Sequence, residues 1–175
     1  MQEVYTMKND IEKITDIIRD AGGKIVGRTR LQKIACLLEL AGLGEGFHFV
    51  YHHYGPYCEE VAWATDTACM MKMICEDEER ASWGGLYSIY SLPELIESDC
   101  ATVRMQLAQA AAKADTISLE LAVTAAYFAA NGKDAPWEEV EIHKPDKTKE
   151  GRLDGAKKLY KKLRLIANTL PEVCE

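Results

Sequence analysis

The feature that most constrains the fold is a stretch of aromatic rings and imidazoles around a Gly-Pro pair, Tyr51 to Glu60. The pattern predicts an extended segment over 47–54, a tight turn, and a long helix whose first helical residue is Pro56. Proline is tolerated there because its missing N–H would have no intrahelical partner. Glu59 and Glu60 would then lie in the first turn, where the helix dipole favours negative charge.

Apolar residues at helical spacing predict further helices on both sides of this stretch. We expect them over 9–21, over 30–41, from 93 to a break near 114–115, from there to 131, over 137–142 and over about 150–170. Asn9 or Asp10 can cap the first of these helices, and Thr29 can cap the second. Residues 75–90 contain the turn Ser82-Trp83-Gly84-Gly85 and predict a β-hairpin, whereas residues 22–28 are expected to connect two helices.

This order of elements predicts a mainly α protein with a small β-hairpin, in the α+β class. A helix pair followed by a third helix and a two-stranded ribbon is typical of a winged helix. A chain of 175 residues is long enough to bury the core of one domain. We therefore expect a single domain over 1–175, in which a winged-helix-like half (about 1–92) packs against C-terminal helices (about 93–175).

Composition and the first residues indicate a cytoplasmic protein. No run of about 18 apolar residues exists, and Met1 to Asp10 lacks the basic start and apolar block of a signal peptide. We expect no membrane partner. No two of the six cysteines have C-x-x-C spacing, so in a reducing compartment we interpret them as buried small hydrophobic residues. They are Cys36, Cys58, Cys69, Cys75, Cys100 and Cys174.

Charge is distributed unevenly along the chain. The net charge is −7, which disfavours general binding to nucleic acid. Residues 147–164, however, contain eight basic and two acidic residues, so this segment carries +6 and the remainder −13. We expect one electropositive face on an acidic body. Its candidate residues are Lys157, Lys158, Lys161, Lys162 and Arg164.

The first turns of the second helix permit a DNA-binding alternative. Basic and amide side chains at a helix N-terminus are what a helix-turn-helix protein offers to DNA. Here they are Arg28, Arg30, Gln32 and Lys33. A solvated polar face explains the same residues, and the acids at 76–79 would repel phosphates from the hairpin. A winged-helix DNA-binding regulator therefore stays the second hypothesis.

The stretch around Pro56 also holds the densest group of metal-ligating and nucleophilic side chains. Alternation along a strand would put His48 and His52 on one face and His53 on the other, which does not close a metal site. Cys58 near a helix N-terminus could have a lowered thiol pKa and pair with a histidine, but no oxyanion-hole signature accompanies it. Residues 22–28 lack the G-K-[ST] ending of a phosphate loop. We therefore predict no enzyme activity, no cofactor and no metal.

Three groups of residues resemble the YwgA-like family, which is related to the Panacea, or SocA-like, antitoxin domain. Gly27 to Ile34 contains Leu-Gln-Lys, Phe47 to Tyr51 follows, and Tyr54 to Val61 contains Tyr-Gly-Pro-Tyr. Leu119 to Phe128 and the Lys144-Pro145 pair are also similar, so the resemblance extends over most of the chain. Cys58 stands where the family often has serine, and Cys36 stands near its usual tyrosine.

The resemblance implies a small helical protein that acts by binding a partner protein. Panacea-type members neutralise toxins or hand a client to a protease, so a toxin or a protease-targeted client is the expected partner. The candidate partner-binding residues are Arg28, Arg30, Gln32, Lys33, His52, His53, Tyr54, Pro56 and Tyr57. Within this set, Gln32 and Lys33 are expected to contact either the partner or the segment around Gly55 and Pro56 (residues 51–58), which we call the Gly-Pro corner.

Overall fold

The computed structural model describes residues 8–94 and 100–174. These residues form seven helices and two small antiparallel sheets, joined by turns and loops. The protein therefore has a mixed α and β structure, as its sequence predicts. The helices are α1 (Asp10–Asp20), α2 (Arg28–Leu40), α3 (Glu59–Met70), α4 (Val103–Lys113), α5 (Thr116–Ala130), α6 (Pro136–His143) and α7 (Arg152–Ile166). The strands are β1 (Lys24–Val26), β2 (Val50–His52), β3 (Gly55–Tyr57), β4 (Cys75–Arg80) and β5 (Leu86–Ser91).

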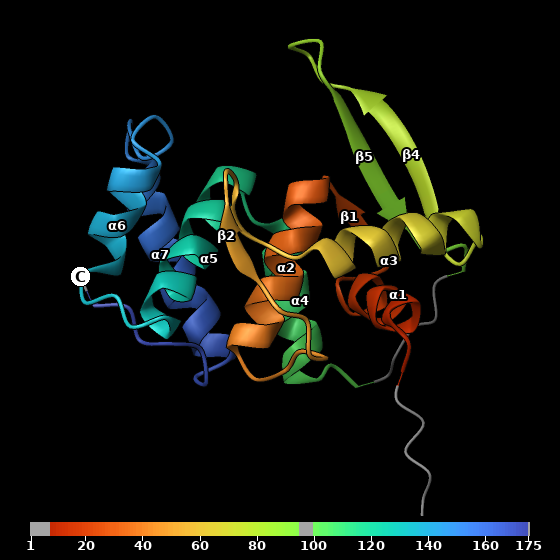
Figure 1. Ribbon diagram of the computed structural model, residues 1–175, viewed down its shortest axis with the longest axis horizontal. Helices are drawn as coiled ribbons and strands as arrows, with labels where there is room; N and C mark the ends of the chain where they lie inside the picture. The colour runs from red at the N-terminus through yellow and green to blue at the C-terminus, as the bar shows by residue number, and fades with distance from the viewer. Residues whose placement is uncertain (1–7, 95–99, 175) are drawn as a thin grey trace, which may run out of the picture.

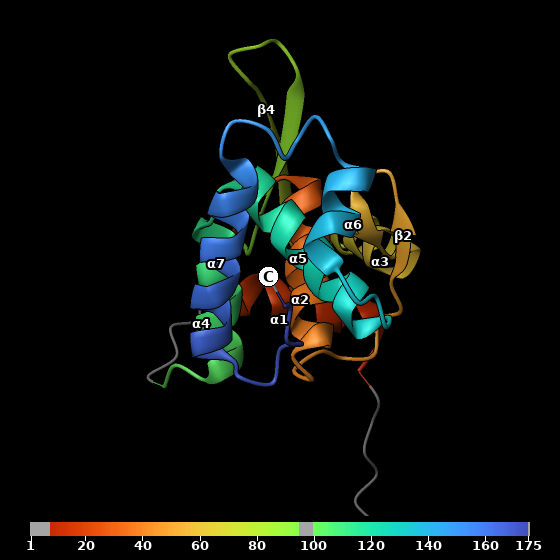
Figure 2. The same ribbon diagram turned by 90° about the vertical axis from the view of Figure 1, so that its left-hand side faces the viewer.

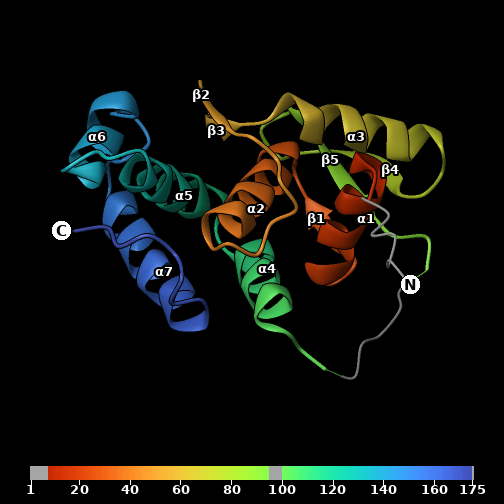
Figure 3. The ribbon, with the colours of Figure 1, turned by 60° about the horizontal axis from the view of Figure 1, so that its bottom comes forward.

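Helix α2 lies in the middle of the molecule (Figures 1 and 3). Helices α1 and α3 and the sheet β1-β5-β4 lie on one side of it, and α5, α6 and α7 lie on the other. Buried apolar side chains from all seven described helices form one connected cluster. None of these helices has both the length and the apolar character needed to cross a membrane.

Local signals in the sequence account for several helix ends. Asn9 caps α1, because its side chain accepts a hydrogen bond from the Glu12 backbone and the Glu12 carboxylate accepts one from the Asn9 backbone. Asp115 caps α5 through the Ser118 backbone N–H at 2.9 Å. The predicted break near residue 114 is therefore confirmed.

The hairpin β4–β5 is also confirmed, and it extends away from the helices (Figure 1). Glu76 pairs with Tyr90 and Arg80 with Leu86, so the loop spans residues 81–85. The third strand of this sheet was not expected. Residues 24–26 pair with β5, with Ile25 opposite Tyr90, instead of merely connecting two helices. Three residues are too few to produce a recognisable alternation of apolar and polar side chains.

Two predicted helix starts, besides the one at Pro56, are wrong. Helix α2 begins at Arg28, after Gly27 with φ +100°, and the side chain of Thr29 is not its cap. The Gly27 N–H continues the pairing with β5 by donating to the Ser88 carbonyl, which turns the chain directly from strand into helix. Pro93 does not begin α4, which is capped at Thr102. The rest of that predicted start, Leu95 and Ile96, lies outside the described residues.

The Gly-Pro corner is a second, smaller hairpin and not a helix start. His52 pairs with Gly55 and Tyr51 with Pro56, so His53 and Tyr54 form the turn. Pro56 is a strand residue, and α3 begins at Glu59 with Cys58 at its N-cap. A proline is acceptable in this strand because a two-stranded ribbon leaves one row of N–H groups unpaired.

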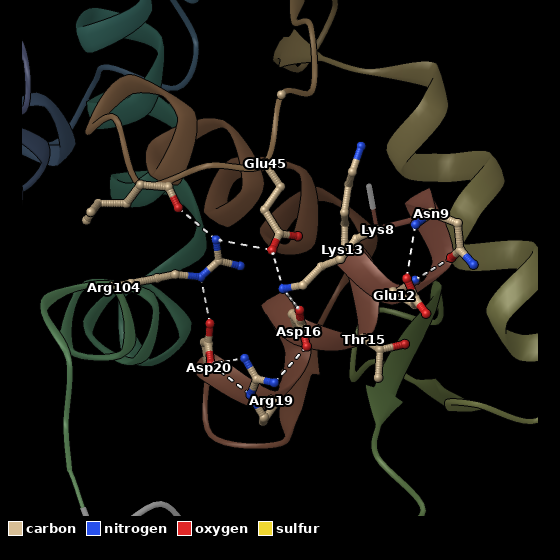
Figure 4. Close-up of polar contacts among 12 residues, drawn as sticks. Lys8, Asn9, Glu12, Lys13, Thr15, Asp16, Arg19, Asp20, Glu45 and Arg104 are labelled. Carbon is tan, nitrogen blue, oxygen red and sulfur yellow. Dashed lines mark hydrogen bonds and ion pairs between the residues drawn. The ribbon is translucent and has the colours of Figure 1, made fainter. Parts of the chain in front are cut away.

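A network of charged side chains fastens α4 and the loop after α2 to α1 (Figure 4). Arg104 Nε donates to the Asp20 carboxylate at 2.6 Å, and its Nη1 donates to the Leu43 carbonyl at 2.7 Å. Arg19 bridges Asp20 and Asp16. Because Asp20 is buried, its pair with Arg104 matters more for stability than the exposed pairs around it.

Candidate functional site

Helix α2 holds the Gly-Pro corner from inside. The Gln32 side-chain amide makes two hydrogen bonds with the Cys58 backbone, accepting from its N–H at 3.0 Å and donating to its carbonyl at 2.9 Å. The Lys33 Nζ donates to the Pro56 carbonyl at 2.6 Å. Both side chains are buried. Of the two roles expected for Gln32 and Lys33, the structure therefore places them against the corner, out of reach of a partner on the surface.

A buried carboxylate lies beneath the same corner. Glu120, on α5, accepts hydrogen bonds from Lys144 at 2.7 Å and from Lys147 at 2.7 and 2.8 Å. Glu120 and Lys144 are both buried, and the Lys144 Nζ also donates to the His53 carbonyl at 3.2 Å. The corner is thus fastened by ammonium groups from two directions, one on α2 and one after α6. This arrangement fixes its position relative to both halves of the chain.

The pKa of Lys33 is lowered from 10.5 to about 8 because burial disfavours the charged amine, and nearby Lys144 and Lys147 add to this effect. The amine of folded Lys33 therefore loses its proton at a lower pH than the amine in the unfolded chain. Relative to a Lys33→Met variant, the wild-type free energy of unfolding is expected to rise by about 3 kcal/mol from about pH 7 to about pH 11.

Urea unfolding across this pH range tests that expectation. The difference between wild type and variant is the relevant quantity, because buried tyrosines and cysteines change the stability of both proteins in the opposite direction. Lys162→Met, on the exposed side of α7, controls for the loss of one lysine. A wild-type minus Lys33→Met difference that does not change with pH would contradict the lowered pKa.

The outer side of the corner is accessible. His52, His53 and Tyr54 are exposed, and the Tyr54 side chain has 64% of its surface free. The Lys147 ammonium lies 5.1 Å from the centre of the Tyr54 ring. Pro56 is buried and Tyr57 half-buried. Of the aromatic and histidine residues expected to contact a partner, three are therefore at the surface.

Arg28 and Arg30 also take part in the fold. Arg28 donates to Glu76 at 3.1 Å and to the Tyr90 hydroxyl at 3.1 Å, and its guanidinium remains largely exposed. The hydrogen bond with Glu76 is the largest cause of the raised Arg28 pKa. Arg30 donates to the carbonyls of Ala112 and Ala114 at the end of α4 and to Thr116 at the start of α5. It thereby joins α2 to the α4–α5 break.

Helix α3 presents an acidic and apolar face to solvent. From Glu59 to Met70 it contains three acidic residues and no lysine or arginine. The side chains of Trp63 and Met70 are 78% and 83% exposed, on the same side of the helix as Glu59 and Asp66. The sequence alone predicts Trp63 and Met70 beside the inner apolar stripe of this helix, formed by residues such as Val61, Ala64 and Ala68. The exposure of Trp63 and Met70 could not be recognised before the packing of α3 against α1 was known.

Two of the surface grooves beside these elements differ in size and lining. The larger, about 750 Å³, lies between the β4–β5 hairpin and the starts of α2 and α5. Its apolar lining includes Val26, Trp83, Leu86 and Ile117. The smaller, about 450 Å³, lies between α1 and α3 and is lined by Asn9, Asp10, Ile11, Glu59, Glu60, Trp63, Ala64 and Thr67.

The basic residues of α7 lie at the other end of the molecule from α3 and the hairpin (Figures 1 and 3). Figure 2 shows α7 alongside α4. Lys158, Lys161 and Lys162 are exposed, whereas Lys157 and Arg164 are half-buried. The Lys157 ammonium lies 5.8 Å from the centre of the Trp137 ring, and Arg164 pairs with Glu172 at 3.4 Å. The expected basic face is thus made mainly by three lysines.

The structure does not place an activated thiol at the corner. Burial raises the pKa of the Cys58 thiol to about 11, and its hydrogen bond to Glu60 acts in the same direction. The nearby helix N-terminus was expected to lower the pKa of this thiol, but burial raises it by more. In the part of the chain that the structure describes, no three His, Cys, Asp or Glu side chains are grouped to hold a metal ion. Cysteine burial was predicted correctly for Cys36 and Cys58 but not for the exposed Cys75, Cys100 and Cys174.

The central buried charge, Glu120, was missed by sequence reasoning. A single acid within the apolar run of Leu119 to Phe128 was the available signal, because an unpaired carboxylate is rarely buried. The two motifs Leu31-Gln32-Lys33 and Tyr54-Gly55-Pro56-Tyr57 meet in the folded chain through the contacts described above. Comparison with protein-family models, curated proteins and solved structures found no match to this chain.

Proposed function

We propose that this protein is a non-enzymatic protein-binding regulatory module, of the kind that the YwgA-like and Panacea resemblance implies for antitoxins and proteolytic adaptors. The observation that carries the proposal is the exposed face of α3, where Trp63 and Met70 lie among acidic residues. Large exposed aromatic and methionine side chains are enriched at protein interfaces. The partner would be a toxin or a client protein.

A winged-helix-like arrangement of residues 1–92 is part of this proposal. It is supported by the order α1-β1-α2-α3-β4-β5 and by the sheet order β1-β5-β4. In a DNA-binding winged helix, the third helix and the hairpin would lie against phosphates and need basic side chains. Here α3 and β4 are acidic, which favours a protein partner over DNA.

DNA binding is the second candidate, favoured by the exposed lysines of α7 and the exposed guanidinium of Arg28. A gel-shift assay with duplex DNA at low salt tests it. Binding that weakens steeply as salt is added, and that is lost in a Lys158→Gln/Lys162→Gln variant, would support it. The absence of a shift at low salt would remove it.

Affinity purification from the native host tests the first proposal. Tagged wild-type protein is expected to retain a stoichiometric protein partner, identified by mass spectrometry, and a Trp63→Ala/Met70→Ala variant is expected to lose it. The matched control is Ile142→Ala/Leu165→Ala, which removes two exposed apolar side chains from α6 and α7 instead. Finding no stoichiometric partner under several growth conditions, or equal retention by both variants, would contradict the proposal. Co-expression with the product of the adjacent gene provides a second route to the same comparison.

A further inference from the structure

We propose that the groove between α1 and α3 receives an arginine or lysine side chain of a basic partner segment, with its cation against the exposed face of Trp63. This inference rests on the proposed function and specifies the chemistry of the partner. The groove has a volume of about 450 Å³ and combines one exposed indole, an apolar floor and carboxylates. The groove beside the β4–β5 hairpin also contains an exposed indole, Trp83, an apolar lining and the carboxylate of Glu78, but Arg28 and Arg30 line it too and offset that negative charge.

The charge of the groove comes mainly from Glu59 and Glu60. Asp10 is paired with Lys13 at 2.8 Å, whereas Glu59 makes no ion pair within the described residues. Glu60 accepts a hydrogen bond from the Cys58 thiol at 3.1 Å, which lowers the Glu60 pKa and keeps the carboxylate ionised. A helix N-terminus alone would attract anions, but two carboxylates already occupy the first turn of α3. The electrostatic field of the groove therefore favours a cation.

Trp63 makes an extended basic side chain the fitting occupant. The indole face attracts cations more strongly than the other aromatic rings do. Ile11 and Ala64 line the same groove and provide an apolar surface for the methylene stem of arginine or lysine. A negatively charged or purely apolar segment would leave Glu59 and Glu60 without a partner. Charge complementarity thus selects a basic segment.

Fluorescence anisotropy with a defined probe tests this site on the full-length protein. The probe is a short fluorescein-labelled peptide in which arginines are separated by pairs of alanines, and the same peptide with glutamate in place of arginine is the negative control. Wild-type protein is expected to bind the arginine peptide and not the glutamate peptide, with affinity that falls as salt is added.

Three variants locate the binding. Glu59→Gln/Glu60→Gln is expected to weaken binding about tenfold, and Trp63→Leu about fivefold, because the leucine keeps apolar bulk without a π face. Glu78→Gln/Glu79→Gln removes the same charge from β4, outside this groove, and is expected to change affinity by less than about twofold. Circular dichroism establishes that each variant is folded.

Two results would overturn the inference: equal weakening by the two glutamate pairs, which indicates general attraction to an acidic surface, or unchanged affinity in Trp63→Leu. Failure of the inference can be separated from failure of the proposed function. If the arginine peptide does not bind, but Trp63→Ala/Met70→Ala still loses the cellular partner, the partner-binding face stands and its basic chemistry is wrong. If neither binding event occurs, both are wrong.

Discussion

Replacement of Glu120 by glutamine is expected to lower the free energy of unfolding by about 4 kcal/mol, because two ammonium groups would lose their shared carboxylate in a buried site. Lys144 is as buried as Glu120, and Lys147 is only about one-third exposed. Glutamine keeps the size of the side chain and removes its charge. The loss therefore measures the buried charge balance and not a cavity. Urea unfolding followed by circular dichroism at neutral pH provides the measurement.

Two further variants make the Glu120 result specific. Glu141→Gln, on the exposed side of α6, makes the same chemical change and is expected to alter stability by less than about 0.5 kcal/mol. Lys144→Met combined with Glu120→Gln removes one of the orphaned ammonium groups. It should recover more than about 1 kcal/mol of the loss. If Glu120→Gln lowers the free energy of unfolding no more than Glu141→Gln does, the buried ion pairs contribute nothing to stability.

Replacement of Gly55 by alanine is expected to lower the free energy of unfolding by about 3 kcal/mol, because backbone strain and a steric clash both contribute. Gly55 has φ +86°, a left-handed conformation that disfavours a side chain. An added Cβ would lie only 2.5 Å from the Thr124 hydroxyl oxygen. Thr124 is fully buried and its hydroxyl donates to the Glu120 carbonyl at 2.7 Å, so it cannot turn away freely. The β2–β3 turn would have to move off α5.

Gly132 is the matched control for the backbone contribution. It has φ +79° and no atom within 4 Å of an added Cβ, so Gly132→Ala should cost only about 1 to 2 kcal/mol. A Gly55→Ala/Thr124→Ala double variant should recover the part caused by the close contact. Thermal unfolding of the three variants separates the two contributions. Equal costs for Gly55→Ala and Gly132→Ala would disprove the close packing of the corner on α5.

Sequence reasoning succeeded where the signal is local. The cap at Asn9, the break between helices near residues 114–115 and the turn between β4 and β5 each depend on residues only a few positions apart. Such short-range interactions do not depend on how distant segments of the chain are arranged. The class of the fold and most helix positions follow from them.

Sequence reasoning failed where a short segment depends on a distant one. Strand β1 forms because β5, more than sixty positions later, offers it backbone partners. Pro56 looked suitable for a helix start, but in the folded chain Lys33 on α2 donates to its carbonyl, and strand β3, which contains it, packs against α5. These packing contacts outweigh the local preference of a proline for the first turn of a helix.

The stretch from Tyr51 to Glu60 shows the same division. Its residue types alone predicted a sharp turn beside Gly55 and a following helix with an acidic first turn; the turn lies at His53-Tyr54 and the helix begins at Glu59. Only the tertiary structure decided that Gln32, Lys33 and Glu120 support this turn from inside while Tyr54 and Trp63 face outward. The physical reason is that burying a polar group is favourable only when its partners are in place. Those partners come from α2, α5 and the segment after α6, which meet only in the folded chain.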